Sequence, residues 1–233
     1  MIELLVVLTV VSVMAALVLP SFHRAKSAAR KAACINNGRQ INIALRLCVE
    51  DNAALVSATN PIYFAYKDMV QPYLGRSEAS VKNDPLFACP ADDFNLDVII
   101  GNWFVATGFT NVSGVGFHRQ SFTHYSSYAL NESVRRRPGG PPNLTVAGVG
   151  LKTFDYVRDP ARTVLIGEIS GCVALSSHDR RERFQFRDER NVMSFVDGHV
   201  SYIRIYWNGL EGPPGMPWFY EPAAGYDYKW SAE

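Results

Sequence analysis

The chain has 233 residues, of which 48% are hydrophobic and 19% are charged. These proportions are typical of folded proteins and exclude a disordered chain, and the length suits one domain with an extension. The 23 basic and 22 acidic residues leave a formal net charge of +1, so no long-range field attracts nucleic acid. We therefore expect partners that are recognised through local contacts, and no specific nucleic acid among them.

The first element is an apolar segment at residues 4–19, which reads LLVVLTVVSVMAALVL and contains only two polar residues. No helix-breaking residue occurs before Pro20. Together with the three residues before it, a helix here would be about 30 Å long, which is enough to cross a hydrocarbon core. A secretory signal peptide is the competing interpretation, but no basic region precedes the segment and no A-x-A-like site clearly ends it. The segment predicts a membrane-embedded helix.

Glu3 places a carboxylate at the start of this apolar segment, where burial in hydrocarbon is costly without a neutralising partner. The first Lys or Arg of the sequence is Arg24, about 30 Å further along a helix. The available cation is therefore a chain-terminal amine, either its own or that of a neighbouring copy. In a staggered bundle of identical helices, such a pair would set the axial register, which indicates assembly.

The opening stretch MIELLVVLTVVSVMAALVLP resembles the N-terminal segment of type IV pilins and type II secretion pseudopilins. In that family a leader is cut, the new N-terminus is methylated, and a glutamate precedes a proline by seventeen positions, as Glu3 precedes Pro20 here. The family glutamate is fifth in the mature chain, so we expect two residues upstream of Met1.

The resemblance implies a bacterial inner-membrane protein that becomes a subunit of an extracellular or cell-surface helical filament. The implied partners are identical subunits, the inner membrane before assembly, an assembly platform and a prepilin peptidase. The residues expected to pack in the filament core are Leu4, Leu5, Val6, Val7, Leu8, Val10, Val11, Val13, Met14, Leu17 and Leu19.

After Pro20, small or apolar residues continue near helical spacing, which predicts an amphipathic extension of the helix to about residue 52. Pro20 is expected to bend the helix or melt it locally. A free-standing coiled coil is the alternative, but sustained heptads are absent. The expected apolar stripe consists of Phe22, Ala25, Ala29, Ala33, Ile41, Leu45 and Cys48. We therefore divide the chain into a helical part, 1–52, and an exported head, 53–233.

The head sequence is rich in Gly, Pro, aromatic and β-branched residues, and it contains short predicted strands. Residues 191–196 and 199–205 alternate around Asp197 and Gly198, which predicts a hairpin with a two-residue type I′ turn. Residues 163–169 predict a further buried strand. The expected fold class is α+β, with a long N-terminal helix packed on a β-rich head that contains an antiparallel sheet.

The head segments also resemble one large pilin-like group, known for a motif of His, nine residues and Asp-Gly. Five stretches match it in order: CINNGRQINIALRLCVEDN, FACPADD, SSYALN, DPARTVLIGE and FVDGHVSYI. Arg187 occupies the histidine position of that motif, so chemistry that depends on its imidazole is not expected. The retained Asp197-Gly198 turn indicates a structural role.

The four cysteines contain no CxxC pair, so a zinc knuckle is not expected. Cys34 and Cys48 would lie about 21 Å apart on one helix and cannot bond to each other. Pairing with Cys89 or Cys172 and small buried thiols are equally weighted alternatives.

No combination of titratable residues has the spacing of a catalytic or metal site, so we expect no enzymatic activity, metal or cofactor. His178, His199 and Asp197 are isolated and are expected to be structural or exposed. An acidic group considered as a calcium site, but favoured as a polar loop, is Asp92, Asp93 and Asp97.

Three sequons, at Asn111, Asn131 and Asn143, are candidate glycosylation sites, and Asn131 is expected to be structural instead. The last segment, 211–233, concentrates Pro, Gly and aromatics. It predicts either a low-complexity linker or, as favoured, an extended arm packed on the head or on a neighbouring subunit.

The favoured hypothesis is a structural filament subunit that polymerises through its N-terminal helix. The alternative is a minor pilin or a secretion pseudopilin whose head binds a partner or a secreted substrate. A membrane-anchored enzyme is the third hypothesis, and no catalytic motif supports it.

Overall fold

The structure is a computed structural model that describes residues 2–52, 62–76, 84–92, 116–120, 124–131, 149, 153–172, 175–179, 188–209 and 221–232. Several sequence predictions lie outside these residues. They concern Met1, the aspartates at 93 and 97, the sequons at Asn111 and Asn143, and Arg187.

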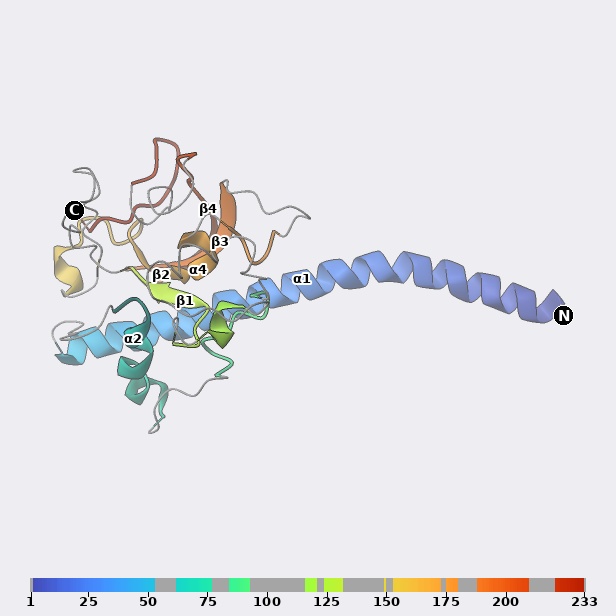
Figure 1. Ribbon diagram of the computed structural model, residues 1–233, viewed down its shortest axis with the longest axis horizontal. Coiled ribbons are helices and arrows are strands. Elements are labelled where there is room, and N and C mark those ends of the chain that lie inside the picture. Colours follow the sequence, from blue (N-terminus) through green and yellow to red (C-terminus); the bar gives the residue numbers. More distant parts are fainter. Residues whose placement is uncertain are drawn as a thin grey trace.

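Helix α1 spans Ile2–Asn52 without interruption and contains Pro20 in its interior. It arches gently in the part that projects from the head (Figure 1). The predicted bending is therefore present, whereas the predicted local melting is wrong for this structure. A proline removes one hydrogen bond of the helix, and the turns on either side keep theirs.

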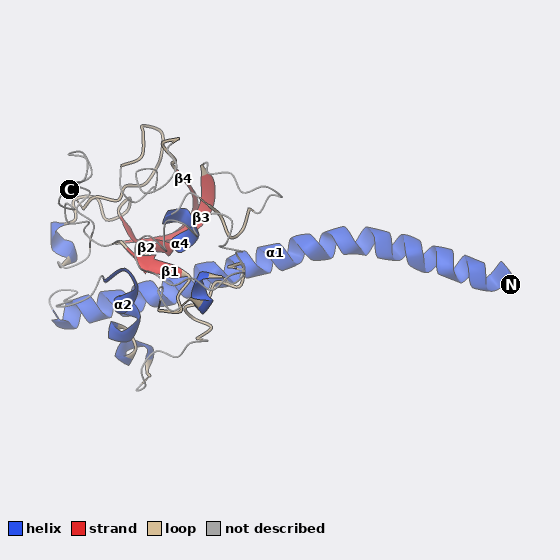
Figure 2. Cartoon of the chain, viewed as in Figure 1, coloured by secondary structure: helices blue, strands red, loops and turns tan. Residues whose placement is uncertain are grey.

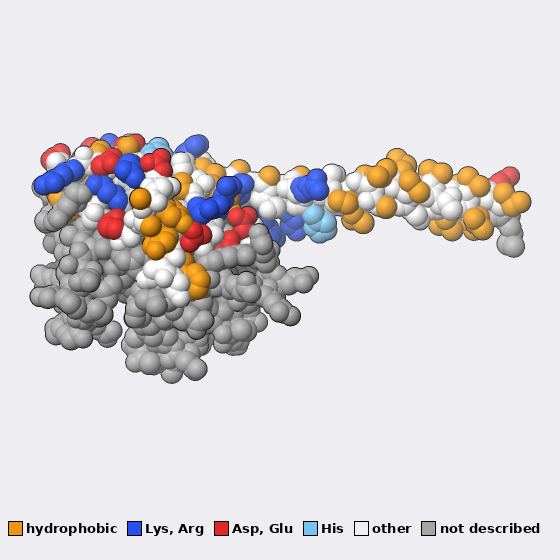
Figure 3. Space-filling model, turned by 90° about the horizontal axis from the view of Figure 1, so that it is seen from above, with side chains coloured by type: hydrophobic (Ala, Val, Ile, Leu, Met, Phe, Trp, Pro, Cys, Tyr) orange, Lys and Arg blue, Asp and Glu red, His pale blue; other side chains and the backbone are white. Residues whose placement is uncertain are grey.

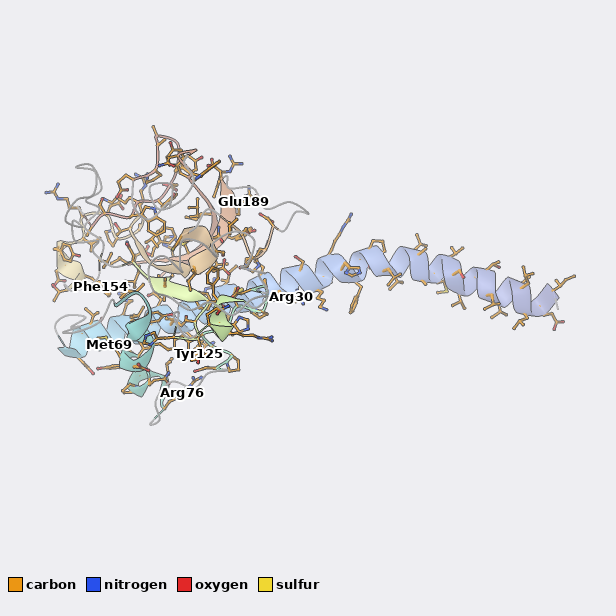
Figure 4. The ribbon with its side chains drawn as sticks, in the orientation of Figure 1. Arg30, Met69, Arg76, Tyr125, Phe154 and Glu189 are labelled. Atoms are coloured by element: carbon orange, nitrogen blue, oxygen red, sulfur yellow. A yellow bond between two sulfur atoms is a disulfide. The ribbon has the colours of Figure 1, made fainter. Side chains whose placement is uncertain are left out.

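The second half of α1 is buried against the head. The buried residues follow the helical spacing of three and four and are Cys34, Gly38, Ile41, Asn42, Ala44, Leu45, Cys48 and Val49. The predicted stripe is correct for Ile41, Leu45 and Cys48. Phe22, Ala25 and Ala29 of the same stripe are exposed, because the head first covers the helix near Arg30 (Figure 4), and Ala33 is partly buried.

Within the described residues, the sheet has four antiparallel strands in the order β1-β2-β3-β4. The strands are β1 (Tyr128–Leu130), β2 (Val164–Glu168), β3 (Glu189–Phe195) and β4 (Val200–Ile205). Helix and sheet together confirm the α+β fold class (Figure 2). The predicted strand at 163–169 and both hairpin strands are confirmed, since β2, β3 and β4 cover these segments.

The β3–β4 hairpin closes through a three-residue loop rather than the predicted two-residue turn. The Phe195 amide donates to the His199 carbonyl, and the Gly198 amide donates to the Phe195 carbonyl, both at 2.9 Å. Gly198 has φ 101°, while Asp197 does not have positive φ. A type I′ turn needs positive φ at both central residues, so that prediction is wrong.

The sheet buries both of its faces. One face packs on α1 in a core that includes Leu130, Ile166 and Val192. The next residue after Val192, Met193, belongs to a second cluster on the opposite face, as the alternation of a strand requires. The small helices around this core are α2 (Ile62–Met69), α4 (Ile169–Cys172), and the 3-10 helices η1 (Pro72–Leu74), η3 (Phe117–Arg119) and η4 (Phe154–Tyr156).

The C-terminal segment 221–232 covers the second face of the sheet. Tyr228 and Trp230 are buried there, next to Phe195 and Ile205. The Val164 amide donates to the Lys229 carbonyl at 3.0 Å. The described part of the predicted aromatic arm therefore packs on the head.

Candidate functional site

The first candidate site is the projecting surface of α1, where every side chain from residue 2 to residue 29 is exposed. The large apolar residues of this part have exposed fractions between 53% and 81%. They form a nearly continuous apolar surface beyond the charged head (Figure 3). All eleven residues predicted to pack in a filament core, from Leu4 to Leu19, lie on it, and none of them is buried against the described part of the head.

By length and composition, α1 is able to cross a membrane. Its most apolar window has a mean hydropathy of 2.7, and none of that window is buried against the head. Residues 2–29 extend for about 42 Å at helical rise, which exceeds the roughly 30 Å of a hydrocarbon core. The structure is therefore compatible with membrane anchoring through this helix.

Glu3 lies in the first turn of α1, at the far end of the apolar surface from the head. Among the described residues, which exclude Met1, no cation pairs with its carboxylate. Its position at a helix N-terminus is favourable for a carboxylate, since the exposed amides there carry partial positive charge. The geometry leaves this carboxylate available to a group outside the described residues.

The junction between α1 and the head is fixed by polar side chains of the helix. The Asn37 amide donates to the Pro85 carbonyl at 3.0 Å and to the Ala88 carbonyl at 3.2 Å. The Arg46 guanidinium donates to the Val196 carbonyl in the hairpin loop at 2.9 Å. These contacts, with the burial described above, hold the head on the second half of the helix.

Cys34 of α1 forms a disulfide with Cys89 in the segment 84–92. Cys48 and Cys172 are buried thiols. Burial raises the pKa of the Cys172 thiol, because a thiolate is poorly solvated there. The disulfide alternative thus applies to Cys34 and Cys89, and the buried-thiol alternative applies to Cys48 and Cys172.

A second candidate site is a buried cluster next to this disulfide. His178 Nε2 lies 2.9 Å from Glu168 Oε1 and 3.7 Å from Cys89 Sγ. The ligand atoms of Cys34, Cys89, Glu168 and His178 all lie within 4.8 Å of one another. The cluster therefore combines two sulfurs, one imidazole and one carboxylate in a small volume.

The residues around this cluster hold Glu168 and His178 in position. Glu168 Oε2 accepts a hydrogen bond from the Val192 amide at 2.8 Å, which leaves Oε1 directed at His178. The His178 and Tyr202 rings meet at 88° with centroids 5.6 Å apart. The His178 side chain is 3% exposed and that of Glu168 is 1% exposed, so the pair is shielded from solvent.

Within the described residues, the other histidine and aspartates that the sequence raised as candidates lie in two groups apart from His178. His199 Nδ1 lies 2.7 Å from Asp197 Oδ1 in the hairpin loop, and its ring stacks on Phe195. Asp92 is buried and accepts hydrogen bonds from the Phe117 and His118 amides, both at 3.1 Å. Neither group joins the cluster of His178.

Asn131 is the one sequon asparagine within the described residues. Its side-chain amide donates to the Val164 carbonyl at 2.6 Å and to the Trp230 carbonyl at 2.8 Å. Both amide hydrogens are therefore committed to the protein interior, where a glycan has no room.

Sequence reasoning missed the cluster because its members are distant along the chain. No short ligand spacing connects positions 34, 89, 168 and 178. The available signals were indirect: Cys34 and Cys89 each fall in a stretch that resembles the pilin-like group, and Glu168 is a carboxylate inside a strand predicted to be buried.

The structure thus defines an α+β protein whose small head contains an antiparallel sheet. The helix that projects from this head is long and apolar enough to span a membrane. No family model, curated protein or solved structure matches the chain.

Proposed function

We propose that this chain is a structural subunit of an extracellular type IV pilus-like filament, and that it polymerises through the projecting part of α1. The subunit is held in the inner membrane before assembly and is processed by a prepilin peptidase. An assembly platform then transfers it to the filament, where its partners are identical subunits. The proposal assigns it no enzymatic activity.

The observation that carries the proposal is the exposed apolar surface at residues 2–29 of α1. Burying a Val, Leu or Met side chain is worth about 1.5–3 kcal/mol, so this surface strongly favours removal from water. Lipid covers this surface before assembly, and the helices of neighbouring subunits cover it in the filament. A membrane anchor alone also uses such a surface, so a second feature has to separate the two roles.

Glu3 is that feature, because a simple anchor gains nothing from a carboxylate at the end of its apolar segment. The lack of a partner among the described residues favours a pairing between chains. A carboxylate in hydrocarbon that meets the terminal amine of the next subunit is stabilised only at one axial offset. Glu3 therefore selects the register in which subunits add to the filament.

The test compares Glu3→Ala with Glu50→Ala, a matched change on the exposed, head-proximal end of the same helix. We expect Glu3→Ala to enter the membrane as well as the unmodified chain, since it removes a polar group, but to lose most filament assembly. Glu50→Ala should retain both. Membrane fractionation gives the first quantity, and electron microscopy of sheared surface material gives the second.

Normal filaments from Glu3→Ala would contradict the register argument. A chain found at a few copies in filaments of another subunit would instead favour the minor pilin or pseudopilin alternative.

A further inference from the structure

We propose that the reduced chain binds one Zn²⁺ through Cys34, Cys89, Glu168 and His178. The disulfide between the two cysteines and the zinc site are then alternative states of the same four residues. The inference concerns the head and stands independently of the filament proposal.

The geometry of the cluster fits a tetrahedral ion. In a zinc site with bonds of about 2.0–2.3 Å, neighbouring ligand atoms lie about 3.3–3.8 Å apart. The Cys89 Sγ to His178 Nε2 distance of 3.7 Å already falls in this range, and all four ligand atoms lie within 4.8 Å of one another. Once the disulfide is reduced, rotation of the cysteine side chains separates the two sulfurs.

The ligand chemistry favours zinc over the hard divalent cations. Two thiolates and an imidazole are ligands that zinc prefers, whereas calcium and magnesium require oxygen ligands. Glu168 supplies Oε1, which already lies beside His178 Nε2, while Oε2 stays fixed by the Val192 amide. Outer contacts of this kind orient the ligands of zinc sites and raise their affinity.

The surroundings also tolerate the charge. One Zn²⁺ with two thiolates, one carboxylate and a neutral imidazole carries a net charge of −1. The Lys31 ammonium lies 4.6 Å from the centroid of the Tyr202 ring, which in turn contacts His178. The Lys31 ammonium is thus separated from His178 by the Tyr202 ring, and its positive charge offsets part of the negative charge of the zinc site.

The redox relation between the two states is explicit. Two thiols, or one phosphine together with one water molecule, give two electrons to the Cys34–Cys89 bond and release two protons, and each sulfur takes up one proton. Zn²⁺ then displaces the two thiol protons, which return to solvent. The two thiols are thereby joined in a disulfide, or the phosphine becomes a phosphine oxide with the oxygen of the water.

The four ligands come from four separate segments, namely α1, the segment 84–92, β2 and the segment 175–179. A bound ion would therefore fasten α1 to the head at the same point as the disulfide does. The consequence is that the helix–head junction persists in a chain whose cysteines have not been oxidised.

The test uses the full chain in detergent micelles, reduced by a phosphine in denaturant and refolded with Co²⁺ or Zn²⁺. We expect one Co²⁺ per chain, with the visible bands of tetrahedral cobalt and a near-ultraviolet thiolate-to-cobalt band. His178→Gln and Glu168→Gln should each lower cobalt affinity at least about tenfold. His199→Gln, which alters a histidine in the hairpin loop, should leave the affinity unchanged.

A second measurement uses zinc and does not depend on spectra. Alkylation followed by mass spectrometry should show slow labelling of Cys34 and Cys89 in the zinc-refolded chain, and fast labelling after a chelator is added. Equal cobalt affinity in His178→Gln and His199→Gln would overturn the proposal. A reduced chain that does not fold in the presence of zinc, or cobalt binding without the thiolate band, would overturn it as well.

Discussion

Asn42 is a polar residue in the middle of the interface between α1 and the sheet. Its side chain is fully buried, and its amide donates to the Phe195 carbonyl at 2.8 Å and to the Ser194 hydroxyl. Both acceptors lie at the end of β3, just before the hairpin loop. Asn42 therefore fixes where the hairpin meets the helix, because its amide binds two neighbouring residues at the end of β3.

We predict that Asn42→Ala lowers the free energy of unfolding of the head by about 1–3 kcal/mol, since it removes the two buried hydrogen bonds that the Asn42 amide donates. Asn36→Ala is the matched control, because Asn36 is exposed on the same helix and should change stability by less than about 0.5 kcal/mol. Denaturant titration of the detergent-solubilised chain measures both. Equal midpoints for the two variants would show that the Asn42 contact carries no net stability.

At the scale of elements, β2, β3 and α4 meet around the Met193 side chain. A Cβ added to Gly167 would lie 2.1 Å from Met193 Sδ, and one added to Gly171 would lie 2.4 Å from Met193 Cε. The two glycines thus provide the space that Met193 fills on the second face of the sheet. Glycine matters at these positions because it lets the Met193 side chain approach β2 and α4 closely, rather than for its backbone freedom.

Gly167→Ala is expected to cost about 1–3 kcal/mol of folding free energy through overpacking against Met193. In a Met193→Ala background the same change should cost less, because the atoms that it meets are gone. Thermal or denaturant unfolding of the four chains in this cycle gives the coupling. Additive costs would mean that the Met193 contact is not the cause.

Gly38→Ala provides the contrast for this prediction. Its added Cβ would meet Val200 Cγ1 at an ordinary 3.5 Å. Because Gly38 lies within α1, alanine there is expected to stabilise the chain by up to about 1 kcal/mol.

At the scale of the whole molecule, the boundary between the projecting part and the head is set by which residues pack on the head. It does not coincide with the end of a helix or strand. One continuous helix serves two environments, since residues 2–29 are exposed while the segment from Cys34 to Val49 contributes to the head core. The boundary of the head therefore lies inside α1, near residue 30. Removing the projecting part should leave the core intact.

We predict that a chain lacking residues 1–28 is soluble without detergent and unfolds within about 0.5 kcal/mol of the full chain in matched detergent, since the removed side chains do not pack on the head. Deleting residues 1–41 should abolish folding, because it also removes Cys34, Asn37 and Ile41. Size-exclusion chromatography and circular dichroism test both. A shorter chain that aggregates would indicate that residues 2–28 support the head.

The sequence was sufficient wherever the deciding pattern is local. The apolar run before Pro20 predicted the projecting helix, and alternation along 191–205 predicted the β3–β4 hairpin. The turn type was mispredicted because Asp197-Gly198 favours a two-residue loop in isolation. The observed loop also meets contacts from α1, where Arg46 binds the Val196 carbonyl, and these are invisible in the local sequence.

The sequence by itself thus determined a long apolar helix, the carboxylate of Glu3 at its start and a β-rich head, because each depends on neighbours along the chain. Only the tertiary structure decided that Cys34 pairs with Cys89, that His178 meets Glu168, and that the helix enters the head near Arg30. Those outcomes depend on residues far apart in sequence, which come together only when α1, the sheet and the connecting segments pack into one core.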